Sequence, residues 1–484
     1  MKKLMILLIA AAVASCAPKA AHLQHPDWAP DVLAGLNDFM DMYGHPSEAS
    51  YAVFDFDNTT AIFDIEENQM NWQLENMAFE MDPERLREAI STDLDLASGV
   101  YDGWIADVSA AYEHLWNEYG PFTWRGLEGE ALEAVRKDPM WQELGGKMYS
   151  MYEVIYAHES PTICYNWTKF WATGMTDAQL DSLSVKTHTI CSSQPTVAKT
   201  WKGSPDIKSA IGPVEFGYEI GTGVTDNLRE LWKTLRDNGI DVWVCSASGT
   251  RQVLMAVDVF GLHDYCTGVL AMTVAHDEQG RLTNRYDYET GHAFLALPGG
   301  GWQEDTLATK CQTCGPGKVT SIMNAIAPKY GGRGPVACFM DSTGDFNFCT
   351  EFSSLKAVLC FNRGNRKVTD GGGLIAEVAI YERDVLGYDL KKANEAGDIF
   401  YMLQGRDDNG MRSLRPSNST VVLGETEERL FANENNYAQY QYFVDNKMSV
   451  RDILEKFCIK TPAEDSPLGF KYGFLNSYDG YRSK

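Results

Sequence analysis

Basic residues are scarce in this 484-residue sequence, which contains 42 Lys and Arg against 67 Asp and Glu and has a net charge of −25. Proteins bind nucleic acids through clusters of Lys and Arg, so this balance argues against a nucleic-acid partner. Internal repeats and low-complexity segments are also missing. The composition, 44% hydrophobic and 23% charged, is that of an ordinary folded protein, and the length suits two or three domains.

Long apolar segments are lacking as well. The one conspicuous run, Leu4 to Val13, is shorter than the roughly 20 residues that cross a bilayer. It follows two lysines and precedes small residues, which predicts a secretion signal. A cysteine directly after Val13-Ala14-Ser15 resembles a bacterial lipobox. That resemblance implies that Cys16 is lipidated, that residues 1–16 are a lipoprotein signal, and that the protein is an exported bacterial lipoprotein of the cell envelope. It would then contact the membrane by its lipid anchor only. Ordinary cleavage nearby, with Cys16 discarded, is the alternative.

Ten cysteines remain besides Cys16. Export permits disulfides, and we expect the pairs Cys164–Cys191 and Cys311–Cys314. A zinc site at the second pair would need two further ligands, and none stands out. Three other cysteines lie in apolar, strand-like runs, where a free buried thiol is the simpler reading: Cys245, Cys338 and Cys360.

Hydrophobic patterning predicts an α/β protein with an insertion. A helix is expected over residues 29–43, and strands over 51–54, 240–245, 268–274, 335–340 and 357–361. Between them, residues 61–221 are helical in pattern and hold eight of the twelve tryptophans. We therefore predict an α/β core at 23–60 and 222–375, a mainly helical, aromatic-rich cap at 61–221, and a C-terminal extension of unknown role at 376–484.

Polar residues follow several of the predicted strands directly. Asp55 and Asp57 come after the first, Ser246 after the second, and Asp341 after a later one. The carboxyl ends of parallel strands are where open α/β sheets place ligands. Taken singly, such residues are more often Asx turns or helix caps, and Lys318 at a predicted helix start is more often a surface lysine. Together they provide a nucleophile, an acid and cation ligands, which phosphoryl transfer requires.

The order Asp55/Asp57/Thr59, Ser246, Lys318, Asp341/Asp345 resembles the four motifs of the haloacid dehalogenase superfamily. The resemblance implies a Rossmann-like parallel-sheet core and a phosphatase in which Asp55 attacks phosphorus. Asp57 would protonate the leaving group and later activate water. The implied phosphate-binding residues are Thr59, Ser246 and Lys318, and the implied Mg²⁺ ligands are Asp55, the Asp57 carbonyl and Asp341, with Asp345 in support. Met340 departs from the family, which often has glycine there.

A narrower resemblance concerns the insertion. The passages Asp57-Asn-Thr-Thr60, Asp64-Ile-Glu66-Glu67 and Cys164-Tyr-Asn-Trp167 resemble bacterial phosphorylcholine phosphatases. A quaternary ammonium is recognised by aromatic faces and a nearby carboxylate, which Glu67, Tyr165 and Trp167 could supply. The alternative is that these aromatics form the core of the cap. The expected substrate is thus a small phosphorylated molecule, phosphorylcholine first, with phosphoserine or phosphoethanolamine as alternatives. A non-catalytic, ligand-binding surface lipoprotein is the alternative of another class.

Overall fold

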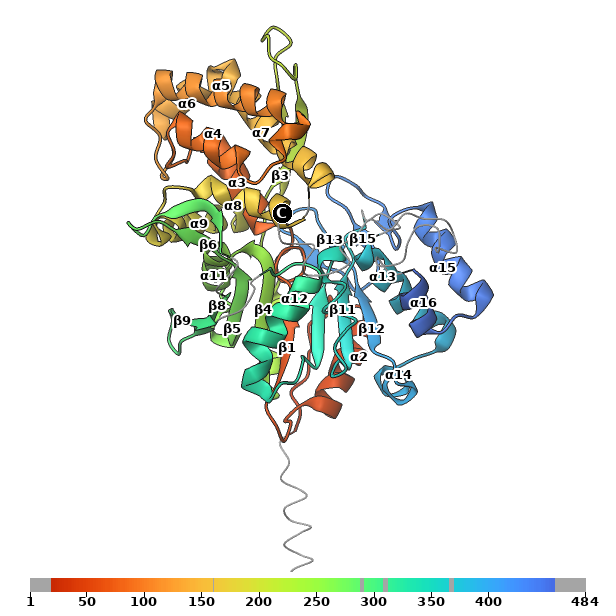
Figure 1. Ribbon diagram of the computed structural model, residues 1–484. Helices are drawn as coiled ribbons and strands as arrows, with labels where there is room; N and C mark the ends of the chain where they lie inside the picture. Colours follow the sequence, from red (N-terminus) through yellow and green to blue (C-terminus); the bar gives the residue numbers. More distant parts are fainter. Residues whose placement is uncertain (1–18, 160, 288–290, 308–311, 365–369, 458–484) are drawn as a thin grey trace, which may run out of the picture.

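The structure is a computed structural model that describes residues 19–159, 161–287, 291–307, 312–364 and 370–457 (Figure 1). Cys16 and Cys311 lie outside the described residues, and with them the predicted lipidation and the predicted Cys311–Cys314 pair. Within the described ranges, no helix has the length and apolar character needed to cross a membrane.

An eight-stranded sheet forms the centre of the molecule, in the order β12-β11-β10-β1-β4-β5-β8-β9. The first six of these strands are parallel, and β8 and β9 pair antiparallel at one edge. This confirms the predicted α/β class with a parallel-sheet core. The strands are β1 (Ser50–Phe54), β4 (Ile240–Gly249), β5 (Gly268–Met272), β8 (Gly291–Ala296), β9 (Trp302–Leu307), β10 (Ala337–Met340), β11 (Ala357–Phe361) and β12 (Phe400–Gln404).

Side chains alternate across β1, as the period of two requires. Ala52 and Phe54 face a core formed with α2 (Pro30–Tyr43), α10 (Asp226–Asp237), α11 (Thr250–Val259) and α14 (Leu390–Ala396). Tyr51 and Val53 face the opposite core, formed with the π-helical turn that continues α12 (Pro316–Ser321) and with α13 (Gly371–Tyr381), α15 (Glu434–Asn446) and α16 (Val450–Lys456). Both faces of the sheet are therefore covered, which explains why its central strands are continuous apolar runs.

The insertion stands above the carboxyl edge of the sheet (Figure 1). It contains α3 (Ile65–Asn76), α4 (Pro83–Ser91), α5 (Asp102–Tyr119), α6 (Gly129–Lys137), α7 (Pro139–His158), α8 (Pro161–Lys169), α9 (Asp177–Ser192) and the hairpin β2 (Val197–Lys202)–β3 (Glu215–Ile220). All of these elements except α9 share a hydrophobic core of their own, and α9 packs in a smaller cluster through Leu180 and Leu183. A hairpin from the core domain, β6 (Val274–His276)–β7 (Leu282–Tyr286), packs on the insertion through Val274 and Leu282.

The predicted disulfide between Cys164 and Cys191 is wrong, because both are buried free thiols. Cys164 packs in the core of the insertion. Cys191 lies near the end of α9, where its carbonyl accepts a hydrogen bond from Thr222 N. The two thiols thus belong to different packing environments. Cys338 is also free and buried, as expected from its place in β10, and Cys245 and Cys360 are buried in β4 and β11.

The segment after residue 375 is closely joined to the rest of the fold. Its strand β12 pairs with β11, so the central sheet continues beyond the predicted limit of the core. A second, four-stranded sheet follows, in the order β14-β13-β15-β16. Its strands are β13 (Arg406–Asp407), β14 (Ser413–Leu414), β15 (Thr420–Val421) and β16 (Glu428–Arg429). Arg406 of this small sheet reaches the loop after β1.

Candidate active site

The loop after β1 places Asp55 at the carboxyl edge of the sheet. Asp55 N still donates to Phe339 O (3.1 Å), so its backbone is held by the neighbouring strand. The chain then turns, because Thr60 N and Ala61 N both donate to Phe56 O at 2.9 Å, and Thr60 Oγ1 donates to Asp55 O at 2.7 Å. This closed turn fixes the direction of the Asp55 and Asp57 side chains.

Lys318 links two of the predicted aspartates. Its Nζ lies 2.6 Å from Asp55 Oδ1 and 2.6 Å from Asp345 Oδ1. Burial alone would lower the pKa of Lys318, but the carboxylates of Asp345 and Asp55 raise that pKa well above its ordinary value. Asp345 Oδ2 also accepts from Asp341 N at 3.2 Å, which orients its carboxylate. Lys318 is thus a buried amine, paired with two carboxylates, beside the predicted nucleophile.

Three carboxylates converge in a way that suits a hard cation. Oxygen atoms of Asp55, Asp341 and Asp345 all lie within 4.8 Å of one another, and all three residues are buried. Burial, and then the charge of Asp345, raises the pKa of Asp55 well above its ordinary value. A divalent cation would offset this repulsion, and an all-oxygen donor set is the kind that Mg²⁺ prefers. The residues present therefore fit the predicted magnesium ion.

Asp57 has the surroundings of a general acid. Its Oδ1 accepts from Ile65 N (2.7 Å) and its Oδ2 accepts from Ser248 Oγ (2.6 Å). Burial, followed by the charges of Asp64 and Asp55, raises the pKa of Asp57 well above its ordinary value. A carboxyl group with a raised pKa keeps a proton that it can deliver to a leaving group.

These groups line one cavity of about 270 Å³ between the sheet edge and the insertion. The floor is formed by Asp55, Asp57, Lys318, Asp341 and Asp345. The opposite wall belongs to the insertion and combines carboxylates with tyrosines: Asp64, Glu66, Glu67, Glu153, Tyr152, Tyr156 and Tyr165. The cavity thus has a metal-binding and lysine-containing end and an acidic, aromatic end.

Glu67 and Tyr165 line this cavity as predicted, but Trp167 does not. Trp167 is 1% exposed, its Nε1 donates to Ile90 O (2.9 Å), and its ring packs edge-on against Trp171. Residues two apart on a helix point in different directions, so Tyr165 and Trp167 cannot face one site. Trp167 is therefore a packing residue of the insertion, which corrects the prediction.

The predicted phosphate-binding residues Thr59 and Ser246 lie behind the cavity wall. Thr59 Oγ1 donates to Asp341 Oδ1 at 3.4 Å. Ser246 is fully buried, and its Oγ accepts from Ser248 N at 3.1 Å. Ser248, two residues on, lines the cavity instead. Ser246 and Thr59 thus support cavity residues, while Lys318 alone of the three lines the cavity itself.

Several residues of the site were not found from the sequence. Arg363 lines the cavity, and its Nη1 lies 3.3 Å from Asp341 Oδ2. It follows the carboxyl end of β11, so the rule that identified Asp55 and Asp341 applied to it as well. Lys169 pairs with Glu66 at 2.6 Å across 103 residues of sequence, and no local pattern signals that pair.

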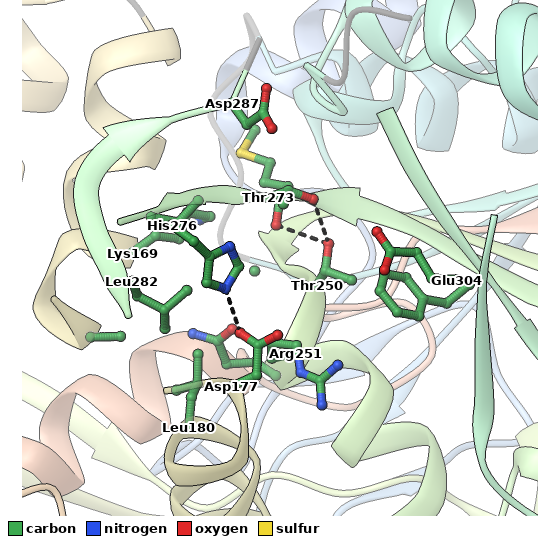
Figure 2. A pocket seen from close by; sticks show the side chains of 16 residues that line it. Lys169, Asp177, Leu180, Thr250, Arg251, Thr273, His276, Leu282, Asp287 and Glu304 are labelled. Carbon is green, nitrogen blue, oxygen red and sulfur yellow. Dashed lines mark hydrogen bonds and ion pairs between the residues drawn. The ribbon is translucent and has the colours of Figure 1, made fainter. Parts of the chain in front are cut away.

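A second cavity of about 300 Å³ lies beyond the Glu66–Lys169 ion pair. Glu66 lines the first cavity, and Lys169 lines the second. Figure 2 shows this second cavity, with His276 bonded to Asp177 and Thr250 bonded to Thr273. It contains none of the predicted site residues.

Comparison with known proteins supports the fold of this chain and does not assign it a family or an activity. No model of a protein family and no curated protein matches the chain. A solved structure of a functionally unknown protein from Anaerococcus prevotii is 23% identical, with a TM-score of 0.62, and the match covers 84% of this chain and 99% of that chain.

Two other solved structures have a TM-score of 0.30, too low to carry an argument. One is a protein of unknown function from Bordetella pertussis, 10% identical, with coverage of 65% of this chain and 82% of that chain. The other is a cytosolic 5'-nucleotidase IIIB bound to cytidine, 13% identical, with coverage of 69% and 78%. The chain therefore shares its fold with the protein from Anaerococcus prevotii, whose function is itself unknown.

Proposed function

We propose that the protein is a magnesium-dependent phosphomonoester hydrolase of the haloacid dehalogenase type. One observation carries this proposal. Asp55, Asp57, Lys318, Asp341 and Asp345 come from separate parts of the chain and line a single cavity at the carboxyl edge of a parallel sheet. A nucleophile, a protonated acid, a fixed positive charge and a set of oxygen ligands are the parts that phosphoryl transfer needs.

In the first step, the Asp55 carboxylate attacks phosphorus, and the bond from phosphorus to the ester oxygen breaks. Asp57 gives its proton to the departing alkoxide, so the free alcohol leaves and Asp55 carries the phosphoryl group. Lys318 balances negative charge on Asp55 and on the phosphate oxygens. Magnesium, held by Asp55, Asp341 and Asp345, would neutralise the phosphate oxygens and thereby allow an anionic nucleophile to approach.

In the second step, Asp57 is deprotonated and accepts a proton from water. That water attacks phosphorus, the bond from phosphorus to Asp55 breaks, and inorganic phosphate leaves. Asp57 ends protonated and Asp55 ends as a carboxylate, which restores the starting state. The hydrogen bond from Ser248 Oγ to Asp57 Oδ2 (2.6 Å) holds the acid in place through both steps.

The acidic, aromatic wall favours a substrate whose alcohol portion is cationic, with phosphorylcholine as the first choice. Tyr152, Tyr156 and Tyr165 offer aromatic surfaces, and Glu67 and Glu153 offer carboxyl groups. Burial, and next the charge of Asp64, raises the pKa of Glu67 to about 8. A bound quaternary ammonium would favour the ionised form of Glu67, which gives an attraction that a neutral alcohol cannot obtain. Phosphoethanolamine, whose alcohol portion is also cationic, is the second candidate, and phosphoserine, which carries a carboxylate as well, is the third.

The test is hydrolysis of phosphorylcholine, phosphoethanolamine, phosphoserine and glycerol phosphate, with and without Mg²⁺. We expect release of inorganic phosphate from all to depend on Mg²⁺ and to be fastest with phosphorylcholine. Asp55→Asn provides the matched inactive protein. Absence of hydrolysis of every substrate, together with binding of choline, would instead indicate a non-catalytic ligand-binding protein.

A further inference from the structure

The loop that carries Asp57 has an unusual backbone. Asn58 has φ = 59° and Phe63 has φ = 67°, both in the left-handed region. The two residues are also joined, because Asn58 N donates to Phe63 O at 3.3 Å. Non-glycine residues seldom adopt this region, and a phenylalanine there is a clear outlier. Such backbone persists only where the surrounding structure holds it.

One buried arginine contacts both of these residues. Arg406 is 2% exposed, and it donates from Nη1 to Asn58 O (3.2 Å) and from Nη2 to Asn58 Oδ1 (3.1 Å). Its guanidinium also lies 5.7 Å from the centre of the Phe63 ring. An ion pair with Asp408, 2.7 Å from Nε to Oδ1, fixes the guanidinium in turn. Arg406 therefore holds both ends of the strained loop.

A second arginine of the same segment contacts the base of the insertion. Arg412, itself at φ = 61°, donates from Nη1 to Gln194 O and to Thr196 Oγ1, both at 2.9 Å. The Arg412 guanidinium also lies close to Gly223, because a Cβ atom added at Gly223 would be only 3.3 Å from Arg412 Nη2. Gly223 pairs with Ile62 through backbone hydrogen bonds of 2.9 and 3.4 Å, and these two residues belong to the two connections between insertion and core.

We infer that Arg406 and Arg412 are positioning residues, through which the segment after β12 sets the geometry of the Asp57 loop and of the base of the insertion. For Arg406 the inference rests on the proposed function, because the loop that it holds carries the proposed general acid. Both arginines lie in the C-terminal extension, residues 376–484, so the inference assigns a role to part of that segment. Neither arginine touches the reacting atoms.

The test compares Arg406→Met, Arg406→Lys and Arg412→Met by amide hydrogen exchange and by kinetics. Arg415→Met is the matched control, because Arg415 lies in the same segment but pairs with Glu428. We expect Arg406→Met to speed exchange in residues 56–64 by about tenfold or more, with Arg406→Lys intermediate. Arg412→Met should speed exchange in residues 192–196 and 221–223 and raise KM more than it lowers kcat. The control should match the unchanged protein.

Unchanged exchange in residues 56–64 of Arg406→Met would overturn the inference for Arg406, and unchanged exchange in residues 192–196 of Arg412→Met would overturn it for Arg412. If Arg406→Met does not fold, Asp408→Asn removes the carboxylate charge that fixes the guanidinium and should speed exchange in the same loop to a smaller extent. The exchange result does not depend on enzyme activity. It therefore stays informative if Asp55→Asn shows that the proposed function is wrong.

The second cavity carries an independent inference. The basic side chains that line it are each paired with a carboxylate: Arg251 with Asp181 (Nε to Oδ1, 2.7 Å), His276 with Asp177 (2.8 Å) and Lys169 with Glu66 (2.6 Å). Asp287 and Glu304 also line the cavity, and each has a partner of its own. Apolar side chains form much of the remaining wall: Leu180, Met272, Val274, Leu282 and Phe294. Among the described residues that line this cavity, the basic and acidic side chains thus already have partners, so a charged ligand would have to compete with them.

Gln252 is the exception among the polar groups of this cavity. It is 4% exposed and lines the cavity, and within the described part of the chain the hydrogen bond of this residue is made by its backbone carbonyl oxygen, with His188 Nε2 at 3.1 Å, and not by its side-chain amide. Gly249 leaves room for that amide, because a Cβ at residue 249 would lie only 2.3 Å from Gln252 Oε1. A carboxamide presents a donor and an acceptor side by side, and its complement is another amide-like edge. We propose that the cavity binds a small, uncharged molecule with an amide-like edge on an apolar ring.

The test uses three probes of nearly equal shape: benzamide, benzoate and benzamidine. We expect ligand-observed NMR to show saturable binding of benzamide and much weaker binding of the anion and the cation. Gln252→Leu and Gln252→Glu should each weaken benzamide binding about three- to tenfold, the scale of one or two net hydrogen bonds. Gln279→Leu, at an exposed glutamine of the β6–β7 turn, should not change it. Equal binding of the three probes, or unchanged binding in both Gln252 variants, would overturn the proposal.

Discussion

Lys318 and Asp55 form a buried ion pair in which Nζ lies 2.6 Å from Oδ1. The pair acts against the rise in the pKa of Asp55 that burial causes, and the proposed mechanism needs Asp55 as an ionised nucleophile. The Lys318 ammonium offsets part of that rise, and its second contact with Asp345 keeps it in position. The lysine therefore acts on the nucleophile before any phosphate arrives.

Replacement of the nucleophile should abolish turnover. We expect Asp55→Asn to lose all measurable phosphatase activity while keeping its fold, since the side chains are nearly equal in size and Lys318 retains Asp345 as a partner. Asp57→Asn should lower kcat by about 100-fold or more, the usual scale for loss of a general acid. Release of inorganic phosphate from p-nitrophenyl phosphate measures both. Near-normal activity of Asp55→Asn would contradict the proposed mechanism.

Activity should require a divalent cation that accepts tight octahedral geometry. Removal of metal by a chelator should stop turnover, and added Mg²⁺ should restore it. Calcium should substitute poorly, because it takes more ligands at longer distances. Asp341→Asn should raise the Mg²⁺ concentration needed for half-maximal activity, because it removes a charged ligand. Full activity in excess chelator would rule out the metal site.

The pH dependence of the free energy of unfolding should include a contribution from His188. This residue is fully buried, and its Nε2 lies 3.1 Å from the carbonyl oxygen of Gln252. Burial lowers the pKa of His188 to about 4. Below the unfolded value of about 6.5, the unfolded chain binds a proton that the folded chain does not. The contribution of His188 to the free energy of unfolding is thus complete above pH 6.5. As the pH falls towards 4, the free energy of unfolding should decrease by about 3 kcal/mol because of this group.

Urea unfolding at pH 7, 5.5 and 4 measures this effect. His188→Gln keeps a hydrogen-bond donor near Gln252 but cannot take up a proton, so its free energy of unfolding should fall less between pH 7 and pH 4. Identical pH dependence in both proteins would mean that His188 is not buried as a neutral group.

The parallel strands and the aspartates that follow them could be predicted from the sequence because their signals are local. An apolar run such as residues 51–54 predicts a buried strand, and a carboxylate directly after it must lie at the carboxyl edge of the sheet. Arg363 carried the same signal after β11. It was missed because a single arginine after a strand has no partner within the local sequence.

Other features of the site depend on contacts that no local pattern contains. Arg406 reaches Asn58 across 348 residues. The direction of Trp167 depends on how α8 packs, and composition could not distinguish a ring in the core of the insertion from one in the cavity. The cavity wall of tyrosines and carboxylates likewise arises only when the insertion folds over the sheet edge.

Membrane attachment is expected to depend on Cys16. Cys16→Ser should block lipidation, so the protein should leave the membrane fraction or accumulate with its signal uncleaved. Cell fractionation followed by immunoblotting measures the distribution. Unchanged membrane association would require another surface of the protein to hold it there.

The final prediction separates recognition of the alcohol from recognition of the phosphate. Glu67 and Tyr165 line the acidic, aromatic wall, whereas Trp167 is buried in the insertion. A desolvated cation–π contact contributes up to about 2 kcal/mol, so Tyr165→Leu should lower kcat/KM for phosphorylcholine by roughly tenfold or more. Glu67→Gln should have a similar effect because it removes the carboxylate. Both should leave kcat/KM for p-nitrophenyl phosphate nearly unchanged, because that substrate carries no ammonium.

Trp167→Leu is the matched structural control. It removes a buried ring from the core of the insertion, so it should lower the melting temperature and affect both substrates to the same degree. Free choline should inhibit the unchanged protein competitively and inhibit Tyr165→Leu more weakly. Equal losses for both substrates in Tyr165→Leu and Glu67→Gln would contradict choline recognition by this wall. The phosphate end of the cavity, with Asp55 and Lys318, would be unaffected by that result, because its chemistry does not depend on which alcohol is attached.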